Sequence, residues 1–132
     1  MKNKIFLGGT CRKSEWRKEL IPLIQVDFFN PIVENRNQES IEIEEAEKKI
    51  CNVHLYVIST PESIYSIAES VQSSLTKGVV TILHVIPLGF NEYELKRMIE
   101  ICNLVIRNGS IAYVDDELRR SARVLNNAFI QL

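Results

Sequence analysis

Short apolar runs of three to six residues recur along the chain, each bounded by Gly, Pro, Asn or Ser. Runs of this length and flanking composition predict buried strands. The predicted strands are Lys4–Leu7, Val26–Phe29, Val53–Ile58, Val79–Leu83 and Ile111–Tyr113. The longer stretches between them alternate apolar and polar positions at helical spacing, and they predict helices over residues 14–25, 39–51, 62–76, 91–107 and 115–130.

Two of these predicted helices have recognisable ends. Ser14 is a residue type that caps helix N-termini, and Asn108-Gly109 is a typical C-terminal stop. Apolar strands that alternate with helices predict a parallel sheet covered on both faces. Five such units suit a small doubly wound α/β fold, flavodoxin-like, with strand order 2-1-3-4-5. With no linker or internal repeat, residues 1–132 are predicted to form a single domain.

Composition narrows the function classes. The chain has 132 residues and a formal net charge of -1, from 16 Lys+Arg and 17 Asp+Glu. This balance does not favour nucleic acid as a partner. No apolar segment approaches the roughly 20 residues that cross a bilayer, and no signal-peptide core is evident, so no membrane association is expected. The acidic run over residues 34–49 is interpreted as a solvated helix face.

The sulfur and imidazole groups give no metal-binding pattern. Cys11, Cys51 and Cys102 form no CxxC motif, and His54 and His84 lack ligand spacing to them. Free thiols predict a reducing, cytoplasmic location, and no metal or organic cofactor is expected. His54 lies within an apolar strand and is interpreted as a satisfied buried histidine.

A candidate ligand site follows from the predicted strand order. Ligands of open parallel sheets bind beyond the carboxyl ends of the strands where the order reverses, here between the first and third strands. The loop Gly8–Lys13 and the loop Ser59–Ser63 converge there, with Asn30-Pro31 at the side. Gly8 and Gly9 would expose backbone N–H donors to a ligand, although a tight turn without a ligand fits them equally well.

The predicted helix 62–76 carries the candidate reactive group. Its apolar stripe is expected to pack on the sheet and consists of Ile64, Ile67, Ala68, Val71 and Leu75. Tyr65 and Glu69 lie off this stripe on one face, which would place Glu69 beside the crevice. A carboxylate there suits a nucleophile or base, and the alternative is an ordinary exposed glutamate. Trp16 is more typical of a core anchor than of a residue that stacks on a base. Arg119, Arg120 and Arg123 of the last predicted helix are expected to face solvent or a subunit interface.

At these residues the chain resembles the nucleoside 2-deoxyribosyltransferase-like superfamily, from Lys4 to about Ser74. The matching pieces, in the family's order, are Lys4–Thr10, Phe29-Asn30-Pro31, Cys51–Val57 and Tyr65–Glu69. Three positions depart from the family pattern. Asn52 stands where the family often has an acid, Ser70-Val71 follows Glu69 in place of Leu-Gly, and Phe6 or Leu7 replaces a common tyrosine.

The resemblance implies cleavage or transfer of the N-glycosidic bond of a 2'-deoxynucleoside or its 5'-monophosphate. Glu69 would be the nucleophile, and Gly8, Gly9 and Thr10 would border the substrate. Asn30 and Asn52 would contact sugar or base, and Ser63 and Ser66 would bind sugar hydroxyls or a 5'-phosphate. The departures at Asn52 and Ser70 favour a second hypothesis, a catalytically silent nucleotide-binding module. A phosphoacceptor domain fits less well, because the strand ends lack an acidic cluster.

The resemblance also implies a homodimer or a higher homo-oligomer. The predicted helix 91–107 gives separate support, because it carries more apolar residues than one face holds. The alternative is that the last helix, residues 115–130, covers it within a monomer.

Overall fold

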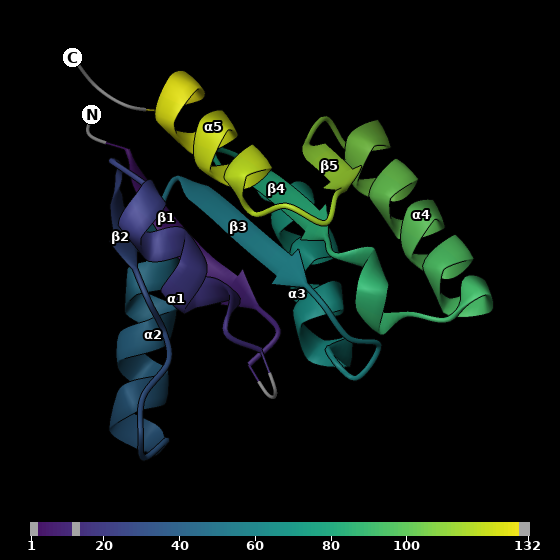
Figure 1. Cartoon of the computed structure of the whole chain (residues 1–132). Helices are drawn as coiled ribbons and strands as arrows, with labels where there is room; N and C mark the ends of the chain where they lie inside the picture. Colours follow the sequence, from purple (N-terminus) through teal and green to yellow (C-terminus); the bar gives the residue numbers. More distant parts are fainter. Residues whose placement is uncertain (1–2, 12–13, 130–132) are drawn as a thin grey trace.

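The structure is a computed structural model, and it describes residues 3–11 and 14–129. Its centre is a five-stranded, all-parallel sheet. The strands are β1 (Lys4–Gly9), β2 (Asp27–Phe29), β3 (Val53–Ile58), β4 (Val80–Val85) and β5 (Ile111–Val114), in the order β2-β1-β3-β4-β5. The predicted doubly wound, flavodoxin-like α/β fold is therefore confirmed (Figure 1).

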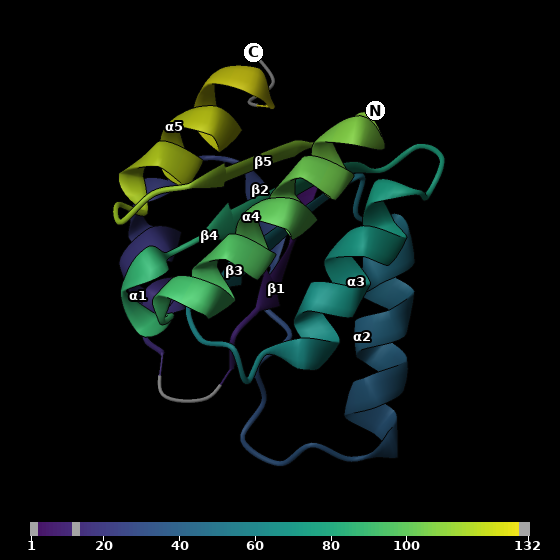
Figure 2. The same cartoon turned by 90° about the vertical axis from the view of Figure 1, so that its right-hand side faces the viewer.

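Helices cover both faces of the sheet (Figures 1 and 2). One face carries α2 (Gln38–Ile50), α3 (Ile64–Ser74) and α4 (Glu92–Arg107). The other carries α1 (Trp16–Leu20) and α5 (Arg119–Ala128), and short 3-10 turns occupy Ile21–Leu23 and Pro87–Gly89. In the described part of the chain, no helix has the length and apolar character needed to cross a bilayer.

Alternate residues of each strand face the two layers of helices and form two cores. Ile5, Leu7 and Leu55 pack with Trp16 and Leu125 beneath α1 and α5. The second core lies beneath α3 and α4 and is made by Tyr56, Ile58, Leu83, Val85, Met98, Cys102 and Val105. Because β3 is covered on both sides, all six of its residues are buried, as its unbroken apolar run predicts.

The first helix is shorter than its sequence pattern predicts. Regular α-helix spans only Trp16–Leu20, because Pro22 lies in the 3-10 turn that follows. Ser14 does not cap this helix; its hydroxyl accepts a hydrogen bond from Ser59 instead. Trp16 is a core anchor, as interpreted from the sequence, and its indole N–H donates to the Thr10 carbonyl. Arg12, Lys13 and the predicted helix end at residue 130 lie outside the described residues.

The two long helices on the α2–α3–α4 face begin with side-chain caps. Asn37 caps α2 and Asn91 caps α4, and each forms a reciprocal capping box with the third residue of its helix. The alternative that the last helix seals α4 is wrong, because α5 packs in the core on the opposite face of the sheet. Met98, Cys102 and Val105 of α4 face the sheet, whereas Tyr93, Ile99 and Ile106 stay exposed.

The buried Arg17 side chain hydrogen-bonds to backbone carbonyl groups of β1 and the following loop, at the point where β2 ends. β2 pairs with β1 only as far as Phe6, so the carbonyl groups beyond this point have no strand partner on that side. Arg17 donates two hydrogen bonds to the Leu7 carbonyl, at 3.3 and 2.9 Å, and one to the Thr10 carbonyl at 2.9 Å. Burial lowers the pKa of this guanidinium, and its donors satisfy backbone oxygens that would otherwise be left unpaired.

Gly9 is required by the chain's own packing. Its φ is +115°, and an added Cβ would lie 2.3 Å from the Val57 carbonyl oxygen. We expect Gly9→Ala to destabilise the fold by about 3 kcal/mol or more, through backbone strain and overlap with β3. Gly78→Ala is the matched control, because Gly78 also has a positive φ of +84° but nothing lies within 4 Å of its added Cβ. Its expected cost is about 1 kcal/mol. Urea unfolding measures both, and equal losses would contradict the steric explanation.

Candidate functional site

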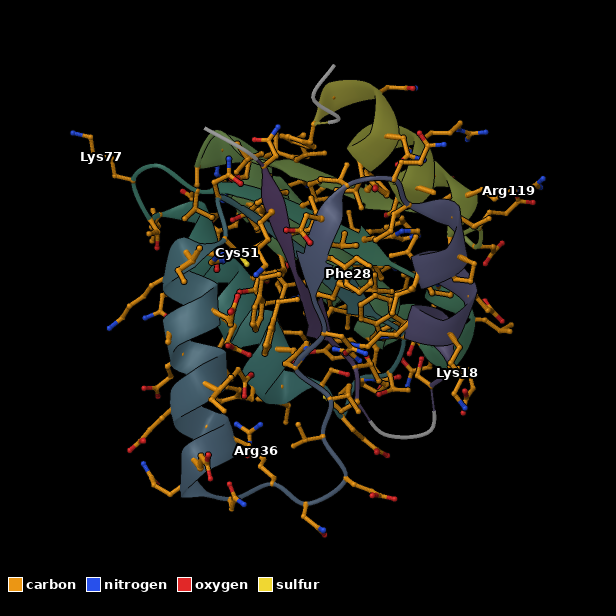
Figure 3. The ribbon with its side chains drawn as sticks, turned by 90° about the vertical axis from the view of Figure 1, so that its left-hand side faces the viewer. Lys18, Phe28, Arg36, Cys51, Lys77 and Arg119 are labelled. Atoms are coloured by element: carbon orange, nitrogen blue, oxygen red, sulfur yellow. The ribbon has the colours of Figure 1, made fainter. Side chains whose placement is uncertain are left out.

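A cavity of about 770 Å³ lies between α2 and α3. Arg36, Ile41 and Tyr65 line the end near the carboxyl edge of the sheet, and Asn52, Gly78 and Val79 line the other end. Figure 3 shows Arg36 near the start of α2 and Lys77 beyond its opposite end. Glu69 and Lys48 line the same cavity and bring opposite charges into it from the two helices.

Glu69 forms an ion pair with Lys48. The Lys48 ammonium lies 2.5 Å from a Glu69 carboxylate oxygen, and the side chains are 22% and 15% exposed. The ammonium also lies above the rings of Phe6 and Tyr56, at 5.6 and 5.9 Å from their centroids. Burial lowers the pKa of Lys48, but its hydrogen bond to Glu69 and the nearby Tyr56 outweigh this effect, so the net pKa is raised. Lys48 is therefore a cation that neutralises Glu69.

A chain of polar groups lies under α3. The Nε2 of His54 is 3.0 Å from the Lys48 carbonyl oxygen, which only accepts, so Nε2 carries the proton. The Nδ1 of His54 then accepts from the Ser73 hydroxyl at 2.9 Å, and Ser73 accepts from the Tyr56 hydroxyl at 2.7 Å. Burial lowers the pKa of His54, which favours this neutral form. The interpretation of His54 as a satisfied buried histidine is confirmed.

A second chain of the same kind lies on the opposite face. His84 Nε2 donates to the Asp115 carbonyl, while Nδ1 accepts from Ser121, whose oxygen accepts from Tyr113. Burial lowers the pKa of His84 as well. In both chains the serine hydroxyl is held between an imidazole and a phenol, and both serines are buried. Neither serine is free to act as a nucleophile.

The predicted apolar face of α3 is wrong. Ile64 and Leu75 are 73% and 70% exposed, and Ala68 is exposed as well. Only Ile67 and Val71 of the predicted stripe pack against the core beneath α3. The sheet-facing side of α3 consists instead of small hydroxyl residues, Ser66, Ser70, Ser73 and Ser74. The physical reason is that β3 presents His54 and Tyr56 there, and buried polar groups need hydrogen-bond partners.

The loops at the switch point contact each other directly. The Thr10 hydroxyl oxygen accepts from the Ser59 N–H at 2.9 Å and lies 2.6 Å from the Ser63 hydroxyl. The Thr10 N–H donates to the Val57 carbonyl, and Ser66 donates to the Gly9 carbonyl at 3.1 Å. The structure thus brings together Gly9, Thr10, Ser63 and Ser66, as predicted.

The glycines of the first loop serve packing within the chain. An added Cβ on Gly8 would lie 2.6 Å from the Tyr56 ring, so Gly8 makes room for that ring, and Gly9 makes room for Val57. From the sequence alone, a tight turn and a ligand approach fit these glycines equally well. The contacts of Gly8 and Gly9 agree with the tight turn.

The two candidate asparagines lie at opposite edges of the sheet. The Asn52 side chain accepts from the Lys4 N–H at 2.9 Å and donates to Asn3, so it lies at the amino end of β1, whereas Gly9 is at the carboxyl end. It does line the same cavity as Glu69. Asn30 is exposed, and its side-chain oxygen accepts from the Ile32 N–H. The structure therefore places Asn52 at the opposite end of β1 from Gly9, whereas Asn30 follows β2 at the carboxyl edge of the sheet.

Lys48 and Arg17 are the residues that the sequence interpretation missed. Lys48 belongs to the charged run on α2, where nothing local distinguishes it from its neighbour Lys49. Arg17 follows Trp16, and the two stack with 4.3 Å between the guanidinium carbon and the ring centroid. Only the packing of α2 beside α3, and of α1 beside β1, identifies these two cations.

A scan against protein-family models, a search of curated proteins and a search of solved structures each found no match. Within the described residues, no group of three or more His, Cys, Asp or Glu side chains is arranged to hold a metal ion. The site is therefore characterised by its own geometry, a carboxylate and an ammonium in a cavity between two helices.

We expect Lys48→Met to destabilise the fold by about 1 to 3 kcal/mol, because it leaves the mostly buried Glu69 carboxylate without its partner. Lys49→Met is the matched control, since Lys49 is the exposed neighbour on the same helix, and it should change stability by less than about 0.5 kcal/mol. Urea unfolding of both variants measures the difference. Equal effects would show that the ion pair contributes nothing.

The two buried histidines predict a loss of stability in mild acid. Their lowered pKa means that the unfolded chain binds more protons than the folded one as the pH falls below about 6.5. The stabilisation that comes from keeping the two histidines neutral is therefore complete above this pH. It is lost as the pH falls toward the lowered pKa values that the histidines have in the folded protein. Thermal unfolding between about pH 7.5 and pH 5.5 should show a falling midpoint, with a smaller fall in His54→Gln. A flat wild-type profile would contradict buried neutral imidazoles.

Proposed function

We propose that this protein cleaves or transfers the N-glycosidic bond of a 2'-deoxynucleoside or its 5'-monophosphate, with Glu69 as nucleophile. The observation that carries the proposal is the position of Glu69. It is the sole charged residue of α3, and that helix turns it inward to line the large cavity beside Lys48. A surface glutamate without a function is more commonly left in solvent.

In the proposed reaction the Glu69 carboxylate attacks the anomeric carbon while the bond to the base breaks, through an oxocarbenium-like transition state. The base leaves with the bonding electrons and takes up a proton from water. The glycosyl-enzyme then passes the sugar to a second base or to water, which regenerates the carboxylate. Lys48 has to give up its contact with Glu69 as the carboxylate engages the sugar.

The resemblance to the nucleoside 2-deoxyribosyltransferase-like superfamily supports the same choice of residue. The arrangement of Gly9, Thr10, Ser63 and Ser66 around the start of α3 agrees with the substrate positions that it implies. Helix α3 also links these four residues to Glu69. Ser66 lies one turn before Glu69 on α3, and its hydroxyl donates to the Gly9 carbonyl. A homo-oligomeric, cytoplasmic enzyme belongs to this proposal. Cys51 and Cys102 are buried thiols whose pKa is raised to about 11 by burial, so both stay protonated near neutral pH.

A second candidate, a catalytically silent nucleotide-binding module, is favoured by two contacts. Asn52 stands where the family often has an acid, and its side chain bonds to Lys4 and Asn3 of the chain itself. Glu69 is held by Lys48. Incubation with each deoxynucleoside plus a free base, and separately with each deoxynucleotide, distinguishes the candidates. Release of free base supports the enzyme, whereas thermal stabilisation by ligand without turnover supports the binding module.

Glu69→Gln should abolish base release, because a neutral amide is a far poorer nucleophile of nearly the same volume. Glu62→Gln is the matched control, since Glu62 is exposed and precedes the same helix, and it should keep the wild-type rate. Chromatography of the released base measures both variants. With a 2'-fluoro-2'-deoxynucleoside, which slows oxocarbenium formation, mass spectrometry should find the sugar attached to Glu69. A wild-type rate in Glu69→Gln would exclude this mechanism.

A further inference from the structure

The leaving base of the proposed reaction needs a proton that Asn52 cannot supply. The base departs with the electron pair of the glycosidic bond, and a general acid that protonates it speeds this step by about 100-fold or more. Asn52 stands where the resemblance expects an acid, but a carboxamide has no acidic proton at neutral pH. Its oxygen accepts from the Lys4 N–H, and its amide donates to Asn3. A different group that lines the cavity is needed for this role.

The buried groups beneath the cavity hold their protons within the chain. His54 donates its Nε2 proton to a backbone carbonyl of α2, and Tyr56 donates to Ser73. Burial lowers the pKa of His54 and raises that of Tyr56, so the imidazole carries no second proton and the phenol keeps its own. Arg36, at the end of the cavity, pairs with Glu44 at 2.7 Å, and a guanidinium does not lose its proton in proteins. These groups are therefore unsuited to acid catalysis.

Lys48 carries its proton beside the attacking carboxylate. It comes from α2, whereas Glu69 comes from α3, and both line the cavity between these neighbouring helices (Figure 2). In retaining glycosidases the nucleophile and the acid flank the bond that breaks, about 5 Å apart. A sugar that separates Lys48 from Glu69 by this distance would lie between the two groups. The ammonium ends a flexible four-carbon stem and is still 22% exposed, so it can follow the departing base.

From this placement of an ammonium and a carboxylate in one cavity, we propose that Lys48 is the acid–base catalyst of the reaction. The inference rests on the proposed function and adds the residue that moves the proton. As Glu69 bonds to the anomeric carbon, the electrons of the glycosidic bond pass to the base, which takes a proton from the Lys48 ammonium. Water then attacks the anomeric carbon and gives one proton to the Lys48 amine, while the ester electrons return to Glu69. Over one cycle of hydrolysis, water therefore replaces the proton that the base carries away.

The two groups are coupled, because the covalent bond to the sugar removes the charge of Glu69. Burial is the largest influence on the pKa of Lys48 and lowers it, but the hydrogen bond and charge of Glu69, together with Tyr56, raise the net pKa. In the glycosyl-enzyme Glu69 is a neutral ester, so its contribution disappears while burial remains. The pKa of Lys48 therefore falls as the base leaves. Other charged side chains line the cavity on and before α2 and keep their charge throughout; they include Arg36, Glu44, Glu45 and Lys49.

Lys48→Arg tests this role, because it keeps a cation beside Glu69 that cannot give up its proton. Its rates are compared within matched pairs of substrates. The ordinary members, 2'-deoxyguanosine and 2'-deoxyuridine, need a proton on the departing base. The activated members need it less, since 7-methyl-2'-deoxyguanosine releases a neutral base and 5-fluoro-2'-deoxyuridine releases a more stable anion. The pair that the wild type cleaves is used, as nucleosides or as 5'-monophosphates.

We expect Lys48→Arg to lower kcat/KM by about 100-fold or more on the ordinary substrate and by less than about 10-fold on the activated one. Lys48→Met, which also lacks the proton, should show the same preference. Lys96→Arg is the matched control, because Lys96 is exposed on α4, outside the cavity, and it should keep the wild-type rate on both.

The ratio of the two rates is measured on one preparation, so partial unfolding of a variant lowers both rates equally and leaves the ratio unchanged. Equal losses on the two substrates, or no loss on the ordinary one, would overturn the role of Lys48 and leave Glu69 as the nucleophile. A wild type that releases base from none of these substrates would instead contradict the proposed function, and this inference with it.

Discussion

The need to satisfy polar groups buried on β3 determines how α3 is oriented. His54 and Tyr56 point from the sheet toward this helix, and each lies in a layer from which water is excluded. A buried hydroxyl or imidazole without a partner costs more than a small apolar contact gains. Ser73 satisfies both groups at once, which rotates the serine side of α3 onto the sheet.

The orientation of α3 has two consequences for the surface of the molecule. It turns Glu69 toward α2, where Lys48 neutralises it at 2.5 Å within the cavity. It also turns Ile64 and Leu75 outward into solvent. The inward position of Glu69 and the outward position of Ile64 and Leu75 are therefore two results of one hydrogen-bonding requirement, and a change at Ser73 would affect both.

The carboxyl edge of the sheet shows how a ligand-binding position can be used by the chain itself. Hydrogen bonds among Thr10, Ser59 and Ser63 join the two loops at the switch point. Arg17 donates hydrogen bonds to the Leu7 and Thr10 carbonyl oxygens, which have no partner from β2. The cavity that Glu69 lines lies instead between α2 and α3, on one face of the sheet. A substrate that reached Glu69 would enter along the groove between α2 and α3, with Tyr65 at one end.

The order of the elements and the sheet topology followed from the sequence, because buried parallel strands are continuous apolar runs and their order obeys few alternatives. The sequence placed Glu69 on the helix that follows β3 and beside a crevice at the switch point, whereas the structure has it lining the cavity between α2 and α3. It did not place Lys48, nor did it show that Asn52 lies at the opposite end of β1 from Gly9. The face that α3 buries was mispredicted, since periodicity assumes an apolar surface beneath the helix. Only the tertiary structure brings His54 and Tyr56 beneath that helix, where hydrogen bonding outweighs the apolar pattern.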